Sequence, residues 1–133
     1  MKIAVAEPLN VNVKIPVTNT RGVFCGPIIR SLSDAGVQVN VTAVFTVAQV
    51  RAIAECLSPD TPAIVSVFAG RIADTGVDPL PVMIACRSIL ATHPAAELLW
   101  ASPREVLNVV HADQAGCHII TATTDILAKL GLF

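Results

Sequence analysis

The sequence contains no tyrosine, one tryptophan and four phenylalanines, so aromatic platforms for stacking nucleic-acid bases are scarce. Charged residues make up only 14% of the chain and the formal net charge is −1, which argues against a basic nucleic-acid-binding surface. Hydrophobic residues make up 53%, enough for a sizeable core in 133 residues. We therefore expect one globular domain over residues 1–133 that binds neither nucleic acid nor a membrane surface.

The four cysteines lack the spacing of a metal site. Cys25, Cys56, Cys86 and Cys117 lie about thirty residues apart, whereas zinc sites use closely spaced ligand pairs. We therefore expect no metal, and reduced, mostly buried thiols in a cytoplasmic protein. The start of the chain lacks the apolar run of a signal peptide, and no segment reaches the roughly 18 apolar residues of a membrane helix.

Short β-branched runs alternate with longer helix-like segments along the whole chain. The pattern predicts strands over 11–17, 37–45, 63–68, 97–101 and 118–122. It predicts helices over 22–35, 78–92 and 102–115, a helix that Thr46 caps and that runs through Leu57, and a short last helix from Thr123 or Thr124. Five units in strict strand–helix order imply parallel strands joined by right-handed crossovers.

Two α/β architectures fit this order, an open doubly wound sheet and part of a (β/α)₈ barrel. Central strands of an open parallel sheet are apolar on both faces. Here Asn12 and Lys14 share one face of the first predicted strand, Asn40 and Thr42 share one in the second, and Ser66 interrupts the third. Such polar groups are typical of a barrel mouth, but a whole barrel needs at least about 200 residues. We therefore predict a partial barrel of five units with two open strand edges.

Lys14 is the sharpest chemical signal, because it lies inside a predicted strand and is one of only three lysines. Burial disfavours an ammonium ion and lowers its pKa, and the neutral amine can attack a carbonyl to form an imine. The alternative is a lysine that reaches solvent at the end of a strand.

Arg71 and Arg104 each follow a predicted strand, and Arg104 falls in the first turn of a predicted helix. The guanidinium fork suits phosphate, so Ser102, Arg104 and the helix amides could form an anion site. The alternative is that both arginines are ordinary surface ion-pair partners. Asp74 and Asp78, in the loop after the third strand, are more typical of turns or caps than of catalysis. Trp100 is expected in the core.

Five segments, in order, resemble the transaldolase and fructose-6-phosphate aldolase family. VKIPVT around Lys14 resembles the strand that carries the family's Schiff-base lysine. NVTAVFTVAQVRAIAE at 40–55 and SVFAGRIAD at 66–74 are similar to the next two units. WASPRE at 100–105 and AGCHIIT at 115–121 match the last two. The resemblance implies the fourth to eighth units of the family's (β/α)₈ barrel.

The resemblance also implies a role for eight residues. Lys14 matches the imine-forming lysine, and Asn40 and Thr42 match polar groups near the substrate and the catalytic water, with Thr42 assigned to catalysis. Ser66 matches a serine that lines the pocket, and Phe68 stands where transaldolases tend to have Phe and the aldolases Tyr. The implied grip on a sugar phosphate consists of Arg71, Ser102 and Arg104.

The family's essential Asp and its Glu or Gln lie on strands that precede the part this chain resembles. Proton transfer by such groups is worth roughly 10²–10⁴ in rate, so we expect impaired turnover by this chain alone. The chain is then expected to be a fragment, a short protein that oligomerises, or one that needs a separate N-terminal half. The implied activity is transaldolase-type transfer of a dihydroxyacetone unit, with no cofactor expected because the lysine imine does the electronic work. The alternatives are fructose-6-phosphate aldolase and a non-catalytic remnant that binds sugar phosphates.

Overall fold

The computed structural model describes residues 1–3 and 11–131. The strands in this part of the chain are β1 (Lys2–Ile3), β2 (Val13–Pro16), β3 (Val39–Val44), β4 (Ala63–Val67), β5 (Ala96–Trp100) and β6 (Ile119–Ile120). The helices are α1 (Gly26–Asp34), α2 (Val47–Ala54), α3 (Ala69–Asp74), α4 (Pro79–Leu90), α5 (Leu107–Gln114) and α6 (Thr124–Lys129).

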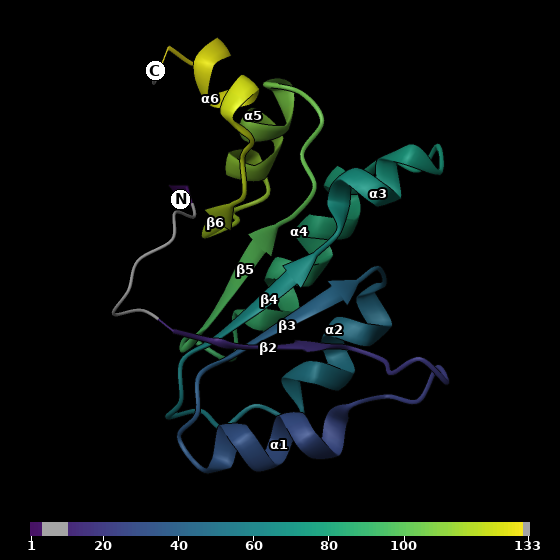
Figure 1. Ribbon diagram of the computed structural model, residues 1–133, viewed down its shortest axis with the longest axis vertical. Coiled ribbons are helices and arrows are strands. Elements are labelled where there is room, and N and C mark those ends of the chain that lie inside the picture. The colour runs from purple at the N-terminus through teal and green to yellow at the C-terminus, as the bar shows by residue number, and fades with distance from the viewer. Residues whose placement is uncertain (4–10, 132–133) are drawn as a thin grey trace.

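All six strands form one parallel sheet in the order β1-β6-β5-β4-β3-β2 (Figure 1). From β2 to β6 each strand lies next to its neighbour in sequence, with no reversal of strand order. A doubly wound sheet reverses at a switch point, whereas a (β/α) barrel adds each strand on the same side. The predicted partial barrel is therefore confirmed, and the open doubly wound alternative is wrong.

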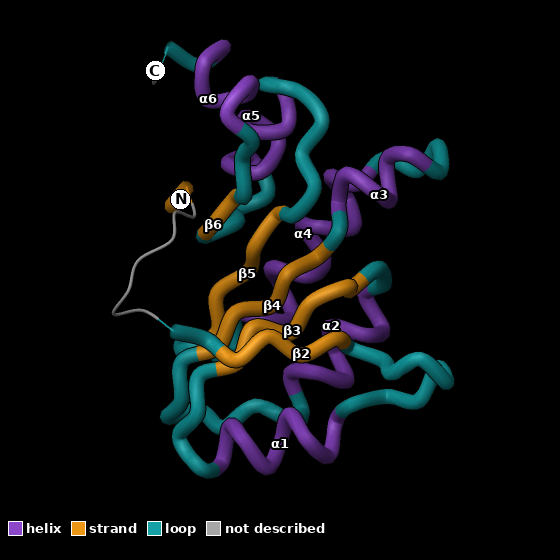
Figure 2. The backbone as a smooth tube through the Cα atoms, viewed as in Figure 1, coloured by secondary structure: helices purple, strands orange, loops and turns teal. Residues whose placement is uncertain are grey.

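The two faces of the sheet differ, because successive side chains in a strand point to opposite sides. Lys14, Asn40 and Ile64 are cross-strand partners in register and therefore share one face, called here the inner face. Figure 2 shows α2 and α4 behind the sheet on the opposite, outer face, with α1 at one end and α5 and α6 at the other.

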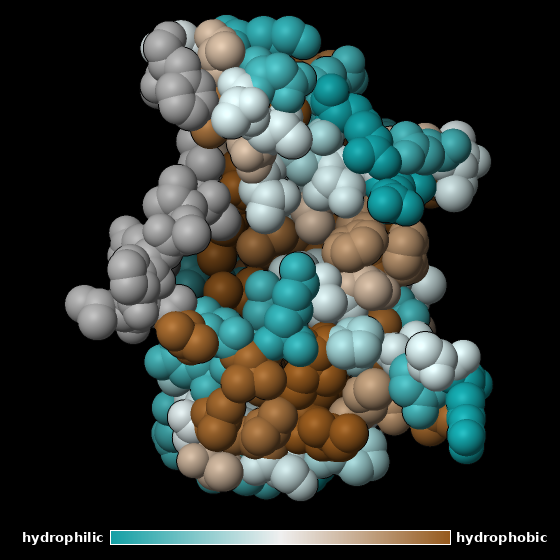
Figure 3. Space-filling view, in the orientation of Figure 1, coloured by the Kyte–Doolittle hydropathy of each residue, from teal (hydrophilic) through white to brown (hydrophobic). Residues whose placement is uncertain are grey.

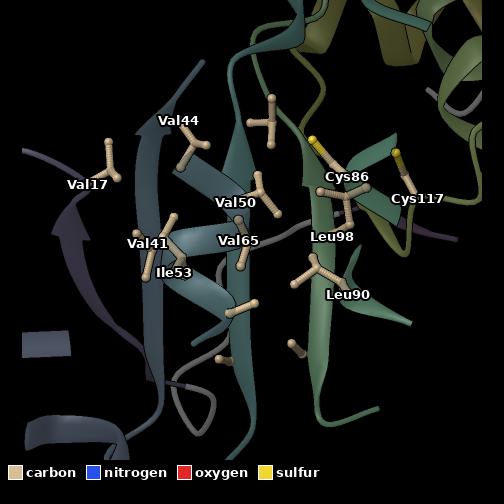
Figure 4. Packing of buried hydrophobic residues seen from close by; sticks show 14 of the residues in the cluster. Val17, Val41, Val44, Val50, Ile53, Val65, Cys86, Leu90, Leu98 and Cys117 are labelled. Atoms are coloured by element: carbon tan, nitrogen blue, oxygen red, sulfur yellow. The ribbon is translucent and has the colours of Figure 1, made fainter. Parts of the chain in front are cut away.

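The main core lies between the outer face and the helices. Val41, Val65 and Leu98 point from neighbouring strands toward Ile53 of α2 and Leu90 of α4, and each of the five is at most 1% exposed (Figure 4). Full burial of one such side chain contributes about 1.5–3 kcal/mol. Trp100, fully buried in the same core, confirms its expected place.

A smaller apolar cluster occupies part of the inner face. It consists of Leu99, Ala101 and Ile119, with Ile64 and Phe68 packed against them. Toward β5 and β6 the inner face carries this apolar cluster together with Glu97, the cross-strand partner of Ile64, while Lys14, Asn40, Thr42 and Ser66 make it polar toward β2. This division places the polar groups at the open side of the sheet.

The predicted start of the first helix is corrected. The segment before α1 is a turn in which the Asn19 side chain accepts hydrogen bonds from the amides of Arg21 (2.9 Å) and Val23 (3.0 Å), so α1 begins at Gly26 instead of Gly22. By contrast, α2 begins as predicted, because Thr46 and Gln49 form a capping box.

The strand–helix count also differs from the prediction. Strand β1 pairs with β6 and was not predicted, and the segment 69–74 predicted as loop forms the short helix α3. Asp78 caps α4 through a hydrogen bond from the Leu80 amide (3.0 Å), as expected for a loop acid. None of the helices described is long and apolar enough to cross a membrane.

Candidate functional site

Lys14 lies on β2, which pairs only with β3 among the described strands and is therefore an edge of the sheet. Its side chain is exposed. The expectation that the strand shields this amine from water is wrong for the described chain. Because the residue lies at an edge and no described helix covers the inner face, water reaches it directly.

Asn40 and Ser66 form a hydrogen-bonded pair beside Lys14. Asn40 is the cross-strand partner of Lys14, and neighbouring strands lie about 4.8 Å apart. The Ser66 hydroxyl donates to Asn40 Oδ1 at 2.6 Å, and Ser66 is only 3% exposed. This bond holds the Asn40 amide in one orientation next to the lysine. The structure thus brings together three of the residues that the sequence predicted for one site.

Thr42 follows Asn40 on the same strand, at a distortion of β3. The register between β3 and β4 shifts between Val41 and Val44, and Ala43 has a φ of 57°. Side-chain-bearing residues seldom adopt positive φ, and bulges of this kind re-aim side chains and cluster near functional sites. Thr42 is half-buried beside this bulge.

Phe68 follows β4 directly and precedes the first residue of α3. Its ring meets the ring of Phe45, which follows β3, edge to face with centroids 5.6 Å apart. Phe68 also packs on the apolar cluster of the inner face. The two rings form an apolar rim at the carboxyl ends of β3 and β4.

Two consecutive segments at the carboxyl ends of β4 and β5 are tightly joined through Gly70. The Gly70 amide donates to the Ala101 carbonyl at 3.2 Å, and a Cβ built on Gly70 would lie 1.5 Å from the Ser102 carbonyl oxygen. Only glycine fits this approach. The contact ties α3, which carries Arg71, to the loop that carries Ser102 and Arg104.

The Ser102–Arg104 loop has its own internal support. Ser102 has a φ of 58°, an uncommon conformation for serine. The buried Asn108 side chain accepts hydrogen bonds from the amides of Arg104 (2.7 Å) and Glu105 (3.0 Å). Arg104 therefore lies in a loop, and not in the first helical turn as predicted, because α5 begins only at Leu107. Sequence reasoning missed Asn108; its only signal was an Asn four residues after the arginine.

Arg104 is paired with Asp74. Its Nη2 lies 2.7 Å from Asp74 Oδ2 and its Nε lies 3.5 Å from Oδ1. The hydrogen bond from Arg104 holds the pKa of the Asp74 carboxyl below its usual range, with a smaller contribution from the charge of Arg71. Both partners are about half exposed, so the pair contributes little to stability. Asp74 thus lies on α3, paired with Arg104 and within electrostatic reach of Arg71, the two arginines predicted to bind phosphate.

Two of the three histidines contact neighbouring side chains. The His111 ring stacks at a tilt on Trp100 with centroids 6.3 Å apart, and His93 lies 3.1 Å from the Thr92 hydroxyl. Residues 1–3 and 11–131 contain no group of three or more His, Cys, Asp or Glu placed to hold a metal. Cys56, Cys86 and Cys117 are buried, as expected.

Parallel strands added in sequence order define part of a (β/α)₈ barrel, with Lys14 on its inner face and Arg71 and Arg104 after the carboxyl ends of β4 and β5. The family model described as Transaldolase/Fructose-6-phosphate aldolase matches residues 3–132, and the chain belongs to this family.

Two curated relatives illustrate the similarity. A "Probable transaldolase" of Streptococcus equi subsp. zooepidemicus (strain MGCS10565) is 36% identical over 126 residues, covering 91% of this chain and 53% of that protein. A "Probable transaldolase" of Bacillus thuringiensis subsp. konkukian (strain 97-27) is 33% identical over 126 residues, with the same coverage of both chains. The chain thus spans about half the length of the curated relatives it matches.

Proposed function

We propose that this chain carries the imine-forming site of a transaldolase-type enzyme, which transfers a dihydroxyacetone unit between sugar phosphates. The observation that carries this proposal is the group formed by Lys14, Asn40 and Ser66 on the inner face. The family membership and the arginines at the same rim support it.

In the proposed reaction, the neutral Lys14 amine attacks the C2 carbonyl of a ketose phosphate such as fructose 6-phosphate. Loss of water gives an iminium ion. The C3–C4 bond then breaks, its electron pair moves toward the iminium nitrogen to give an enamine, and the C4 hydroxyl loses its proton to a base. An aldose phosphate leaves. The enamine adds to the carbonyl of an acceptor aldose phosphate, which takes up a proton, and water releases the product from Lys14.

The polar partners of Lys14 have proposed roles in these steps. Asn40, held by Ser66, would donate hydrogen bonds from its amide to substrate hydroxyl oxygens. Thr42 would orient the water that is lost and regained during imine formation and hydrolysis. Phe68 would bound the substrate on its apolar side. No cofactor is needed, because the iminium nitrogen accepts the electron pair.

The far end of the substrate carries a phosphate. Arg71, Ser102 and Arg104 lie on two segments locked together at Gly70. Guanidinium groups present several N–H donors to phosphate oxygens, and the Ser102 hydroxyl can add another. These donors on joined backbone segments support a phosphorylated substrate over a free sugar.

The open edge of the sheet at β2 supports the proposal that further protein covers it. Figure 3 shows apolar side chains gathered between β2 and α1. Several residues in and around these elements are large, apolar and exposed: Val11, Val13, Val23, Phe24 and Ile28. We propose that further β/α units, or a second copy of the chain, cover this edge, and that such further units supply the carboxylates for proton transfer. The four free cysteines support a reducing compartment such as the cytoplasm.

Product analysis tests the proposed activity. Fructose 6-phosphate is incubated with the protein with and without an aldose phosphate acceptor. Without the acceptor, a transaldolase releases at most one glyceraldehyde 3-phosphate per Lys14 site and then stops, whereas an aldolase turns over and also releases free dihydroxyacetone. Lys14→Arg should abolish either product, and Lys129→Arg, at an exposed lysine of α6, should not. A folded protein that binds fructose 6-phosphate without forming product would instead support a binding remnant.

A further inference from the structure

We propose that Asp74 sets the affinity of the phosphate grip, because its carboxylate occupies the guanidinium fork of Arg104 that a phosphate would use. This inference rests on the proposed sugar-phosphate site. In this site, Arg71, Ser102 and Arg104 would attract the phosphate, and Asp74 would weaken its binding.

The Arg104–Asp74 pair occupies donors that a phosphate would use. One carboxylate spans the Nε and Nη2 side of the Arg104 guanidinium at 3.5 Å and 2.7 Å. Phosphate oxygens favour the same two-point arrangement on arginine. An incoming phosphate and the Asp74 carboxylate therefore compete for one set of donors.

The negative charge of Asp74 also opposes the binding of a phosphate. Asp74 interacts electrostatically with Arg71 as well as with Arg104. With Asp74 ionised, the three side chains carry one net positive charge; without that carboxylate they carry two. Figure 3 shows the hydrophilic surface over α3. A phosphate dianion near these residues is thus repelled by Asp74 in addition to losing donors to it.

The Arg104–Asp74 pair is exposed, so it can open to admit a ligand. The side chains of Arg104 and Asp74 are 48% and 51% exposed, so water can replace either partner when the pair opens. The Arg104 backbone stays in place during this exchange, because its amide is held by Asn108. Release of the guanidinium would then be a side-chain movement on a fixed loop.

The test is isothermal titration calorimetry of inorganic phosphate and fructose 6-phosphate against the full chain and matched variants. Asp74→Asn removes the charge, Asp74→Glu keeps it, and Asp78→Asn removes the same charge four residues away. Asn is as good an N-cap as Asp, so the last variant keeps the start of α4. Circular dichroism verifies that each variant is folded.

We expect Asp74→Asn to bind both ligands about fivefold more tightly at low salt, as Coulomb's law gives for unit charges a few ångströms apart in water. The gain should shrink as salt rises. Neither Asp74→Glu nor Asp78→Asn should show it, and it should vanish when Arg104→Ala is added to Asp74→Asn.

Two results would overturn the inference in different ways. If the wild type binds phosphate through Arg104 and Asp74→Asn binds equally or more weakly, Asp74 orients the arginine and does not compete. The proposed function would survive that result. If neither the wild type nor Asp74→Asn binds phosphate or fructose 6-phosphate, the sugar-phosphate site fails together with the inference.

Discussion

Replacing Gly70 by alanine should disrupt the junction between α3 and the Ser102 loop. The new Cβ would lie 1.5 Å from the Ser102 carbonyl oxygen and 2.6 Å from its carbonyl carbon. Real Cβ contacts essentially never fall below 3.0 Å, so the two backbones must part by at least the difference, 1.5 Å. Both partners are backbone, and no flexible side chain can yield.

The direction of the stability change tests the close contact at Gly70. In a helix without such a contact, replacing glycine by alanine normally raises the free energy of unfolding by about 0.5–1 kcal/mol. Against that gain stand overpacking, which costs about 1–3 kcal/mol, and loss of the Gly70–Ala101 hydrogen bond, about 0.5–1.5 kcal/mol. We expect a net loss of about 1–3 kcal/mol in the free energy of unfolding. If phosphate binds at Arg71 and Arg104, its affinity should fall too.

The assay is urea unfolding followed by fluorescence of Trp100, the single tryptophan, which is fully buried. The matched control is Gly26→Ala at the start of α1, where the new Cβ would meet only the ring of the partly exposed Phe24, which can swing away. That variant should change stability by less than about 1 kcal/mol. If Gly70→Ala is as stable as the wild type or more so, the close approach of the two segments is wrong.

Three further predictions concern buried groups. Burial raises the pKa of Cys86 to about 11 and of Cys117 to about 12, from an ordinary value near 9. Stability from these protonated thiols is complete below pH 9 and falls by up to about 1.4 kcal/mol per pH unit for each thiol as pH rises toward 11. The double Cys86→Ala, Cys117→Ala variant should flatten this slope in urea titrations between pH 8 and 10.5, where no tyrosine interferes; an unchanged slope would refute the assignment. Ser66→Ala should lower the free energy of unfolding by about 1–3 kcal/mol, because it leaves Asn40 Oδ1 without its donor. Ser66→Thr keeps a hydroxyl and should therefore lose less stability. Asn108→Ala should cost a similar amount and weaken phosphate binding, with Asn108→Asp restoring acceptance from the two amides; equal phosphate affinity in both variants would contradict a positioning role.

Sequence periodicity was sufficient for the elements with long, regular patterns. Strands β3, β4 and β5 and helices α2 and α4 lie within a few residues of their predicted ranges, because alternation, caps and prolines mark them locally. Strand β1 could not be predicted, since two residues become a strand only by pairing with β6, 117 positions further along the chain. Helix α3 spans six residues and is supported by its contact at Gly70, which leaves no periodic signal.

In the candidate site, too, some features could be predicted from the sequence and others depend on tertiary contacts. The sequence predicted polar groups on single strands and their convergence at a barrel mouth, and the register shows that Lys14, Asn40 and Ser66 share the inner face. The sequence left open whether Lys14 is shielded or reaches solvent, because membership of a strand does not reveal that the strand is an edge. The pairing of Arg104 with Asp74 and the support from Asn108 depend on tertiary contacts that spacing alone does not encode.

The most direct test of the imine chemistry is borohydride reduction in the presence of fructose 6-phosphate, followed by peptide mass spectrometry. The chain has only three lysines, so Lys2 and Lys129 serve as internal controls in the same sample. We expect a reduced adduct on the peptide that contains Lys14 and none on the other two. A folded protein with no adduct on Lys14, or with equal labelling of all three lysines, would contradict the assignment of the inner face as an imine-forming site.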